Sequence, residues 1–198
     1  MLDAGLYREV IAELEREVPD MAVQITTEAV GRYTPEEQRA VVHAVMPKMV
    51  SVALREMIPD TETEEAARFY AWAHEAGIAV QHILYAPGEI DRLFGLVVGG
   101  IVPRDDMQLL FVLGRYARDQ ESDPADLQPF VETLVATGLS ADWAVCAFGH
   151  GETAALGAAF EAGGKARVGF ENSLWNADGS VAADNAERVR EIAARLPH

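Results

Sequence analysis

The sequence predicts an α/β fold of the (β/α) barrel type, in which parallel strands alternate with helices. Strand-like and helix-like segments alternate at regular spacing along the chain, which indicates a parallel sheet with right-handed crossovers. Strand-like segments such as residues 109–113 are almost continuously apolar, as a sheet covered on both faces requires. Polar or ionisable residues follow each of these segments, and barrels of this type gather their chemistry at that end of the strands.

The helices are predicted from apolar spacing and from their start and stop signals. Residues 6–17 place apolar side chains at helical intervals. Thr34-Pro35 supplies an N-cap and a first helical proline, which opens a helix that ends near residue 45. Gly77 ends a helix over residues 63–76. Further helices are expected over residues 89–98, from 123 to about 138, and over 152–162 and 184–196.

Six strands are predicted, over residues 21–27, 49–54, 78–85, 108–113, 142–148 and 165–171. A closed barrel of this type has eight strands, so six strands and one leading helix predict an incomplete barrel. A doubly wound sheet is the alternative. The turn after the first strand reads Thr26-Thr27-Glu28-Ala29 and contains no Gly-x-Gly-x-x-Gly, which disfavours a dinucleotide-binding sheet. The prediction is therefore one barrel-type domain over residues 1–198.

Composition narrows the possible partners. The 198 residues are 49% hydrophobic, enough for one sizeable core, and carry a formal net charge of −16. This charge argues against binding to nucleic acid and to acidic membrane surfaces. The sequence has no apolar run long enough to span a membrane and no signal-peptide pattern. A single cysteine, Cys146, gives no disulfide framework and fits a reducing cytoplasm.

Polar groups gather after all six predicted strands. One such residue is usually a solvated loop residue, but the same pattern after every strand favours a single functional rim. The residues are Thr26, Thr27 and Glu28; Arg55 and Glu56; Tyr85; Arg115 and Tyr116; His150 and Glu152; and Glu171 and Asn172.

The last predicted strand, residues 165–171, carries charges on one face. Strand alternation places Arg167, Gly169 and Glu171 together, opposite the apolar Val168 and Phe170. Buried charges are costly unless they are paired or bind a metal. The pattern therefore indicates either a structural Arg167–Glu171 pair or a charged site at the mouth of the barrel.

The same stretch carries a family resemblance. The sequence reads Gly163-Gly164-Lys-Ala-Arg-Val-Gly-Phe-Glu-Asn172, followed by Asp178-Gly179, Ala182 and Asn185-Ala186-Glu-Arg-Val189. This ordered pattern resembles the end of the β-keto acid cleavage enzymes, also called the 3-keto-5-aminohexanoate cleavage family. The resemblance covers nearly the whole chain, from the family's second helix onward. It implies that the first strand, first helix and second strand are missing, with Met1 an imposed start and residues 1–5 a loop.

The resemblance implies a Claisen-type exchange between a β-keto acid and acetyl-CoA, giving acetoacetate and a new acyl-CoA. It also implies a homo-oligomer and a divalent metal, usually zinc, which polarises the ketone. Glu171 matches a metal ligand, but the family's His-x-His pair has no counterpart here. The histidines are His43, His74, His82, His150 and His198. A catalytic zinc normally has three protein ligands, so the chain alone is expected to bind zinc weakly and to be inactive.

The resemblance also assigns substrate roles. Thr26 and Thr27 match the groups that hold the substrate carboxylate, although Glu28 stands where the family has glycine. Arg167 matches an arginine that works with an aspartate in proton removal, and Asn172 replaces that aspartate. An amide cannot act as a general base at neutral pH.

Other residues near the expected site leave alternatives open. A different carboxylate, Glu28, Glu56 or Glu152, could replace the missing base. Arg55, Glu56 and Arg115 could bind an acidic substrate or pair with one another. Three functional classes therefore stay open: a metal-dependent acyl-exchange enzyme, an inactive or truncated homologue, and a metal-independent lyase that uses Arg167, Glu171 and Arg115.

Overall fold

The computed structural model describes residues 2–29, 31–59 and 62–196. Its strands, within these ranges, follow one another across one six-stranded sheet in chain order. The strands are β1 (Gln24–Thr26), β2 (Met49–Ala53), β3 (Ala79–Leu84), β4 (Gln108–Leu113), β5 (Asp142–Ala147) and β6 (Lys165–Ala166). The pairs β1–β2, β2–β3 and β5–β6 are parallel. The predicted incomplete barrel type with strands adjacent in chain order is confirmed, and the first and last predicted strands end that order.

The Cα positions group the chain into two compact units. Unit 1 comprises Met1–Ile83 and Leu93–Gln108, and unit 2 comprises Leu84–Arg92 and Leu109–His198. The prediction of a single domain stays a prediction. The helix α5 (Gly88–Val98) contributes residues to both units.

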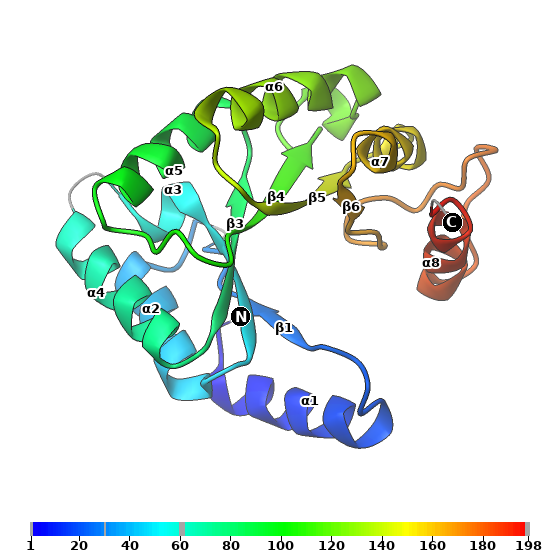
Figure 1. Cartoon of the computed structure of the whole chain (residues 1–198). Helices are drawn as coiled ribbons and strands as arrows, with labels where there is room; N and C mark the ends of the chain where they lie inside the picture. Colours follow the sequence, from blue (N-terminus) through cyan, green and yellow to red (C-terminus); the bar gives the residue numbers. More distant parts are fainter. Residues whose placement is uncertain (1, 30, 60–61, 197–198) are drawn as a thin grey trace. The chain divides into compact units, whose positions relative to one another are not determined.

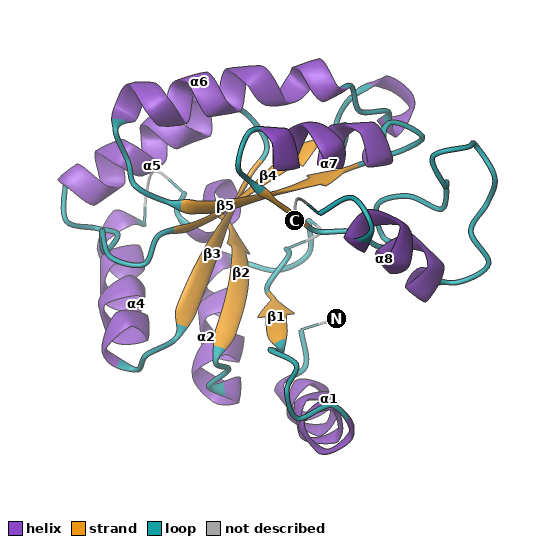
Figure 2. Cartoon of the chain, turned by 45° about the vertical axis from the view of Figure 1, so that its right-hand side comes forward, coloured by secondary structure: helices purple, strands orange, loops and turns teal. Residues whose placement is uncertain are grey.

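Unit 1 alternates helices with β1, β2 and β3, as Figures 1 and 2 show. Its helices are α1 (Ala4–Glu17), α2 (Pro35–Val45), α3 (Leu54–Met57) and α4 (Thr63–Glu75). Asp3 caps α1 by accepting from two backbone N–H groups, so the helix begins at Ala4, and Ala4 and Gly5 are helical where a loop was predicted. Thr34 and Glu37 form a reciprocal capping box at α2.

The core of unit 1 lies between its strands and helices. Val42 of α2 and Val50 and Val52 of β2 are fully buried. The ring of His43 on α2 lies against Trp72 of α4, with centroids 3.7 Å apart and the ring planes tilted by 38°. An aromatic contact therefore joins two helices that are separated in sequence by β2 and α3.

Unit 2 contains β4, β5 and β6 with helices α6 (Gln128–Thr137), α7 (Glu152–Glu161) and α8 (Asn185–Ala193). Two short 3-10 helices, η1 (Arg118–Gln120) and η2 (Pro124–Leu127), precede α6. Figure 2 shows α7 beside β5, and α7 also contacts β6. Phe111 of β4 stacks on Trp143 of β5 with centroids 5.4 Å apart. A Cβ added at Gly164 would lie 2.2 Å from the Trp143 ring, so glycine is required for this approach.

The ends of the predicted sheet need correction. The predicted strand over residues 165–171 is wrong beyond Ala166, because the chain turns at Gly169. The Gly169 carbonyl accepts from the N–H groups of Asn172 at 2.9 Å and Ser173 at 3.1 Å. Arg167 and Glu171 therefore do not share a strand face. The first strand is also shorter than predicted, and Arg55 and Glu56 lie on the short helix α3.

No helix within the described ranges has both the length and the apolar character needed to cross a membrane.

Candidate functional site

The turn after β6 holds Arg167, Glu171 and Asn172 together. The Arg167 N–H donates to the Val145 carbonyl at 2.8 Å, which ties the start of the turn to β5. The Arg167 Nη2 lies 2.6 Å from the Glu171 Oε2, with the two side chains 34% and 63% exposed. The Asn172 Nδ2 donates to the Arg167 carbonyl at 3.4 Å. The structure thus pairs Arg167 with Glu171 at a solvated turn.

Asn172 follows Glu171 in the same turn. Its side chain is buried, and its Oδ1 has no hydrogen-bond partner among the described residues. Its carbonyl accepts from the Gly149 N–H at 3.2 Å, so the turn after β6 is linked to the loop after β5. The amide supplies hydrogen bonds but no titratable carboxyl group.

Glu121 and His150 form a second polar contact in unit 2. The Glu121 carboxylate accepts from the His150 backbone N–H at 2.8 Å, and its other oxygen lies 2.7 Å from the ring Nδ1. Trp175 stacks on the imidazole with centroids 4.1 Å apart. The hydrogen bond from the His150 side chain is the main cause that lowers the pKa of Glu121. No pattern in the sequence predicts Glu121 or Trp175 as site residues, because each lies in a loop without a regular period.

Arg115 and the aromatic residues of unit 2 make further contacts near the strand ends. The guanidinium carbon of Arg115 lies 5.3 Å from the centroid of the Phe148 ring. Tyr85 and Tyr116 pack at 5.2 Å between centroids, and the Tyr116 side chain stays largely exposed. Such a cation–π contact orients a guanidinium while leaving its N–H groups able to bind an anion.

Glu152 lies within a buried network instead of on an open rim. Its Oε2 lies 2.6 Å from the Arg188 Nη2, and both side chains are fully buried. The same Nη2 donates to Thr153 at 2.9 Å, while Nη1 contacts Asn176 and Glu191. Burial raises the pKa of Glu152, and the hydrogen bond and charge of Arg188 partly offset that effect. Sequence reasoning missed Arg188, although it occupies an inward position four residues before Ile192 on α8.

The predicted carboxylate-binding threonines of unit 1 have internal partners. Thr27 is fully buried, and its hydroxyl donates to the Gln38 Oε1 at 3.1 Å. The Thr26 carbonyl accepts from the Tyr7 hydroxyl at 2.7 Å. These contacts fix the end of β1 against α1 and α2, so the Thr27 hydroxyl is already engaged within the fold.

Glu28, Arg55 and Glu56 are the predicted charged site residues that lie in unit 1. The Glu56 Oε2 accepts from the Ala29 N–H at 2.8 Å, which joins α3 to the turn after β1. Burial raises the pKa of Glu56, the Ala29 N–H offsets part of this, the Glu28 charge raises it further, and the Arg55 charge lowers it. Arg55 is exposed and Glu28 half-buried. Each unit therefore brings part of the predicted set together, and the prediction that all lie on one rim stays a prediction.

The donors of this chain do not by themselves fit a zinc site. Across residues 2–29, 31–59 and 62–196, no group of three or more His, Cys, Asp or Glu side chains could hold a metal ion. Glu171 is paired with Arg167. A catalytic zinc with three protein ligands would need further donors.

Alternating strands and helices, with charged turns after the strands, define an α/β protein of barrel type. The sequence profile of the beta-keto acid cleavage enzyme family matches residues 1–197. The chain therefore belongs to this family, and the suspected resemblance is confirmed.

Solved structures support the fold. One match is described as a binary complex of ObcA with oxaloacetate, with a TM-score of 0.69 and 14% sequence identity. The alignment covers 99% of this chain and 53% of ObcA, so this chain spans about half of that protein's length.

Proposed function

We propose that this chain is the keto-acid-binding part of a β-keto acid cleavage enzyme. In the proposed reaction a β-keto acid and acetyl-CoA exchange acyl groups, so that the products are acetoacetate and a new acyl-CoA. One carbon–carbon bond of the β-keto acid breaks, and a new carbon–carbon bond forms with the acetyl group of acetyl-CoA to give acetoacetate. The acyl group released from the β-keto acid takes over the thioester bond to CoA. The family match over residues 1–197 supports this reaction class.

The observation that carries the proposal is the Arg167–Glu171–Asn172 turn. The Arg167 guanidinium is a planar fork that suits a carboxylate, and it is partly exposed beside Glu171. A β-keto acid that approaches this turn would exchange the Glu171 carboxylate for its own. Arg115 is a second guanidinium in unit 2, held over Phe148. Thr26, Thr27, Glu28, Arg55 and Glu56 remain proposed substrate contacts from unit 1.

A divalent metal is part of the proposed reaction, where it would polarise the ketone. The described residues bring no three His, Cys, Asp or Glu donors together, so further ligands would have to come from outside these residues. We therefore assign no step of the reaction to a metal held by this chain. We propose that the chain alone binds keto acid without exchanging acyl groups.

Binding is tested by titrating acetoacetate into the 198-residue chain and following the guanidinium resonances of its arginines by NMR. The Arg167 signal should shift, and Arg167→Met should weaken binding about 10- to 100-fold, because a charge-assisted contact is lost. Arg190→Met, an exposed arginine of α8 with 70% of its side chain accessible, is the matched control. Unchanged affinity in Arg167→Met would remove the proposed role of this turn.

A second candidate is a homologue without catalytic activity. Asn172 stands where the family's aspartate is expected, and the fully buried Glu152 is held by Arg188. Neither group is a free base. An exchange assay distinguishes this candidate from the first. The assay contains a β-keto acid, labelled acetyl-CoA, zinc and an added segment that carries a His-x-His pair, and it compares the original chain with the Asn172→Asp variant. Label in acetoacetate from the original chain supports the enzyme, whereas keto acid binding with label only from Asn172→Asp, or from neither chain, supports the inactive homologue.

We also propose a cytoplasmic location and a homo-oligomeric assembly. The buried Cys146 thiol, which takes part in no disulfide, is compatible with a reducing compartment.

A further inference from the structure

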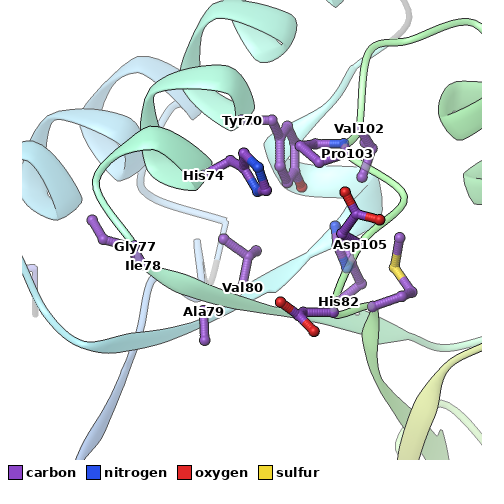
Figure 3. A pocket seen from close by; sticks show the side chains of 12 residues that line it. Tyr70, His74, Gly77, Ile78, Ala79, Val80, His82, Val102, Pro103 and Asp105 are labelled. Atoms are coloured by element: carbon purple, nitrogen blue, oxygen red, sulfur yellow. The ribbon is translucent and has the colours of Figure 1, made fainter.

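Buried side-chain atoms without a hydrogen-bond partner among the described residues occur in both units. In unit 1 one of them is the Nε2 of His82, a residue that Figure 3 shows at the wall of a pocket. In unit 2 there are three, and all belong to the network around Glu152. They are the Glu152 Oε1, the Asn172 Oδ1 and the Arg188 Nε. Polar groups buried this deeply are costly to desolvate, so the network calls for an explanation beyond packing.

Glu152 is the first residue of α7, and its buried carboxylate lies near two other elements. Its Oε2 lies 2.6 Å from the Arg188 Nη2 of α8. Burial raises the pKa of Glu152, and Arg188 lowers it. The Gly169 N–H and the Asn172 side chain lower this pKa further as nearby hydrogen-bond donors. The carboxylate is therefore close both to α8 and to the turn that carries Arg167.

A chain of hydrogen bonds continues from Glu152 to Arg167. The Glu152 N–H donates to the Gly149 carbonyl at 3.3 Å, and the Gly149 N–H donates to the Asn172 carbonyl at 3.2 Å. The Asn172 Nδ2 donates in turn to the Arg167 carbonyl at 3.4 Å. The start of α7 thus holds Asn172, and Asn172 holds the backbone from which the Arg167 guanidinium extends.

The side chain at position 172 suits an ionised Glu152 as an amide but not as a carboxylate. An amide N–H donates toward a carboxylate, whereas a second ionised carboxylate only accepts and repels the first. The positive charge beside Glu152 is already shared, because the Arg188 Nη1 also contacts Glu191. The other charged or titratable side chains on the turn and the neighbouring loops are Glu121, His150, Arg167 and Glu171. The buried space between positions 152 and 172 therefore accommodates one negative charge, and Glu152 carries it.

We propose that Glu152 is a positioning residue for keto acid binding, an inference that rests on the proposed function. Its buried charge holds the Asn172 amide, and the amide fixes the turn so that the Arg167 guanidinium meets the substrate carboxylate. Glu152 itself does not touch the substrate, because its side chain is fully buried. The rival explanation is that Glu152 serves stability alone, by pairing with Arg188.

The test titrates the folded 198-residue chain and its variants with acetoacetate and follows the Arg167 guanidinium by NMR at pH 8 and pH 5. Acetoacetate is ionised at both values, because carboxyl groups of this kind have a pKa below about 4. Asn172→Asp should bind about tenfold more weakly than the original chain at pH 8, because the two carboxylates repel. At pH 5 much of this loss should disappear. Burial and Glu152 raise the pKa of the introduced carboxyl group, which is then protonated and donates a hydrogen bond.

Asn172→Leu removes the donor without adding a charge, so it should bind weakly at both pH values. A second change at position 152 should recover binding in the charged variant. In Glu152→Gln, Asn172→Asp the donor and the acceptor exchange places and one negative charge remains. Its affinity at pH 8 should return to within about threefold of the original. Glu161→Gln, Asn172→Asp removes the same charge from an exposed residue of α7 and should recover nothing.

Original affinity in both single Asn172 variants, or equal affinity in the two double variants, would overturn the proposal. Loss of stability in urea with unchanged affinity would assign Glu152 to stability alone. If the original chain does not bind acetoacetate, the proposed function fails, and the Arg167 Nε resonance without ligand still tests this inference. That resonance should move in Asn172→Asp at pH 8 and return in Glu152→Gln, Asn172→Asp.

Discussion

The Arg188 Nη2 lies 2.6 Å from the Glu152 Oε2, and neither side chain is exposed to solvent. The contact joins α8 to α7 across a gap of 36 residues in sequence. Two charges removed from water need each other and further hydrogen bonds to offset the cost of desolvation. Thr153, Asn176 and Glu191 supply those bonds on the arginine side. The pair therefore fixes how α8 packs against α7.

Arg188→Met should lower the free energy of unfolding by about 3–5 kcal/mol, because it leaves the buried Glu152 charge without a partner. Urea unfolding monitored by circular dichroism measures the change. Arg190→Met on the exposed side of α8 should stay within about 0.5 kcal/mol of the original chain. The double variant Glu152→Gln, Arg188→Met should recover part of the loss. A loss below about 1 kcal/mol in Arg188→Met would show that the buried pair contributes little.

His82 should make stability depend on pH. Its pKa is lowered from 6.5 to about 4 in the folded chain, so the unfolded chain binds more protons between these values. The free energy of unfolding should therefore fall as the pH drops from 6.5 to 4, by about 3 kcal/mol from this group alone. The difference between the original chain and His82→Phe, measured by urea unfolding across this range, isolates the effect. The same slope in both chains would contradict the prediction.

Glu121 should titrate below the ordinary range of glutamate, because the His150 side chain and backbone N–H both donate to it. Carboxyl carbon NMR measures this pKa. In His150→Ala the side-chain bond is lost, and the pKa of Glu121 should rise toward its ordinary value. His74→Ala, in unit 1, serves as the control and should leave the pKa of Glu121 unchanged. If the pKa of Glu121 in His150→Ala stays as low as in the original chain, the backbone N–H and not the side chain lowers it.

The two end strands should exchange amide hydrogens rapidly. β1 and β6 end the strand order, so their outward-facing amides have no neighbouring strand in the described sheet. An unpaired edge also templates association. An apolar groove that includes Phe160, Val168 and Ile192 borders β6. We expect concentration-dependent self-association in light scattering, together with low protection at β1 and β6. A monomer with both strands strongly protected would contradict this expectation.

Most strands and helices could be predicted from the sequence, because the spacing of apolar residues that marks them involves only neighbouring positions in the chain. The apolar run at β4 was predicted with the bounds that the structure has, and the start of α2 followed from Thr34 and Pro35. The end of β6 could not be predicted from alternation. The break comes from Gly169, whose carbonyl accepts two backbone N–H groups, and from Asn185, whose side chain accepts from the Phe170 N–H.

The candidate site was less predictable, because its contacts join residues distant in sequence. The Arg167–Glu171 pair was one of two interpretations of the last strand, and the structure has the pair at 2.6 Å. The partnership of Glu152 with Arg188 was not foreseen, since no local pattern links α7 to α8. The pairing of Glu121 with His150 likewise depends on the fold bringing two loops together.

Two of the three tryptophans rest against imidazole rings, which gives the chain a built-in optical reporter. Trp72 lies on His43 and Trp175 on His150, while Trp143 packs against Phe111 and Gly164. The emission of an indole changes when the ring packed against it moves away. A variant that keeps Trp72 alone should therefore report the unfolding of unit 1 by its fluorescence, and a variant that keeps Trp175 alone should report the unfolding of unit 2.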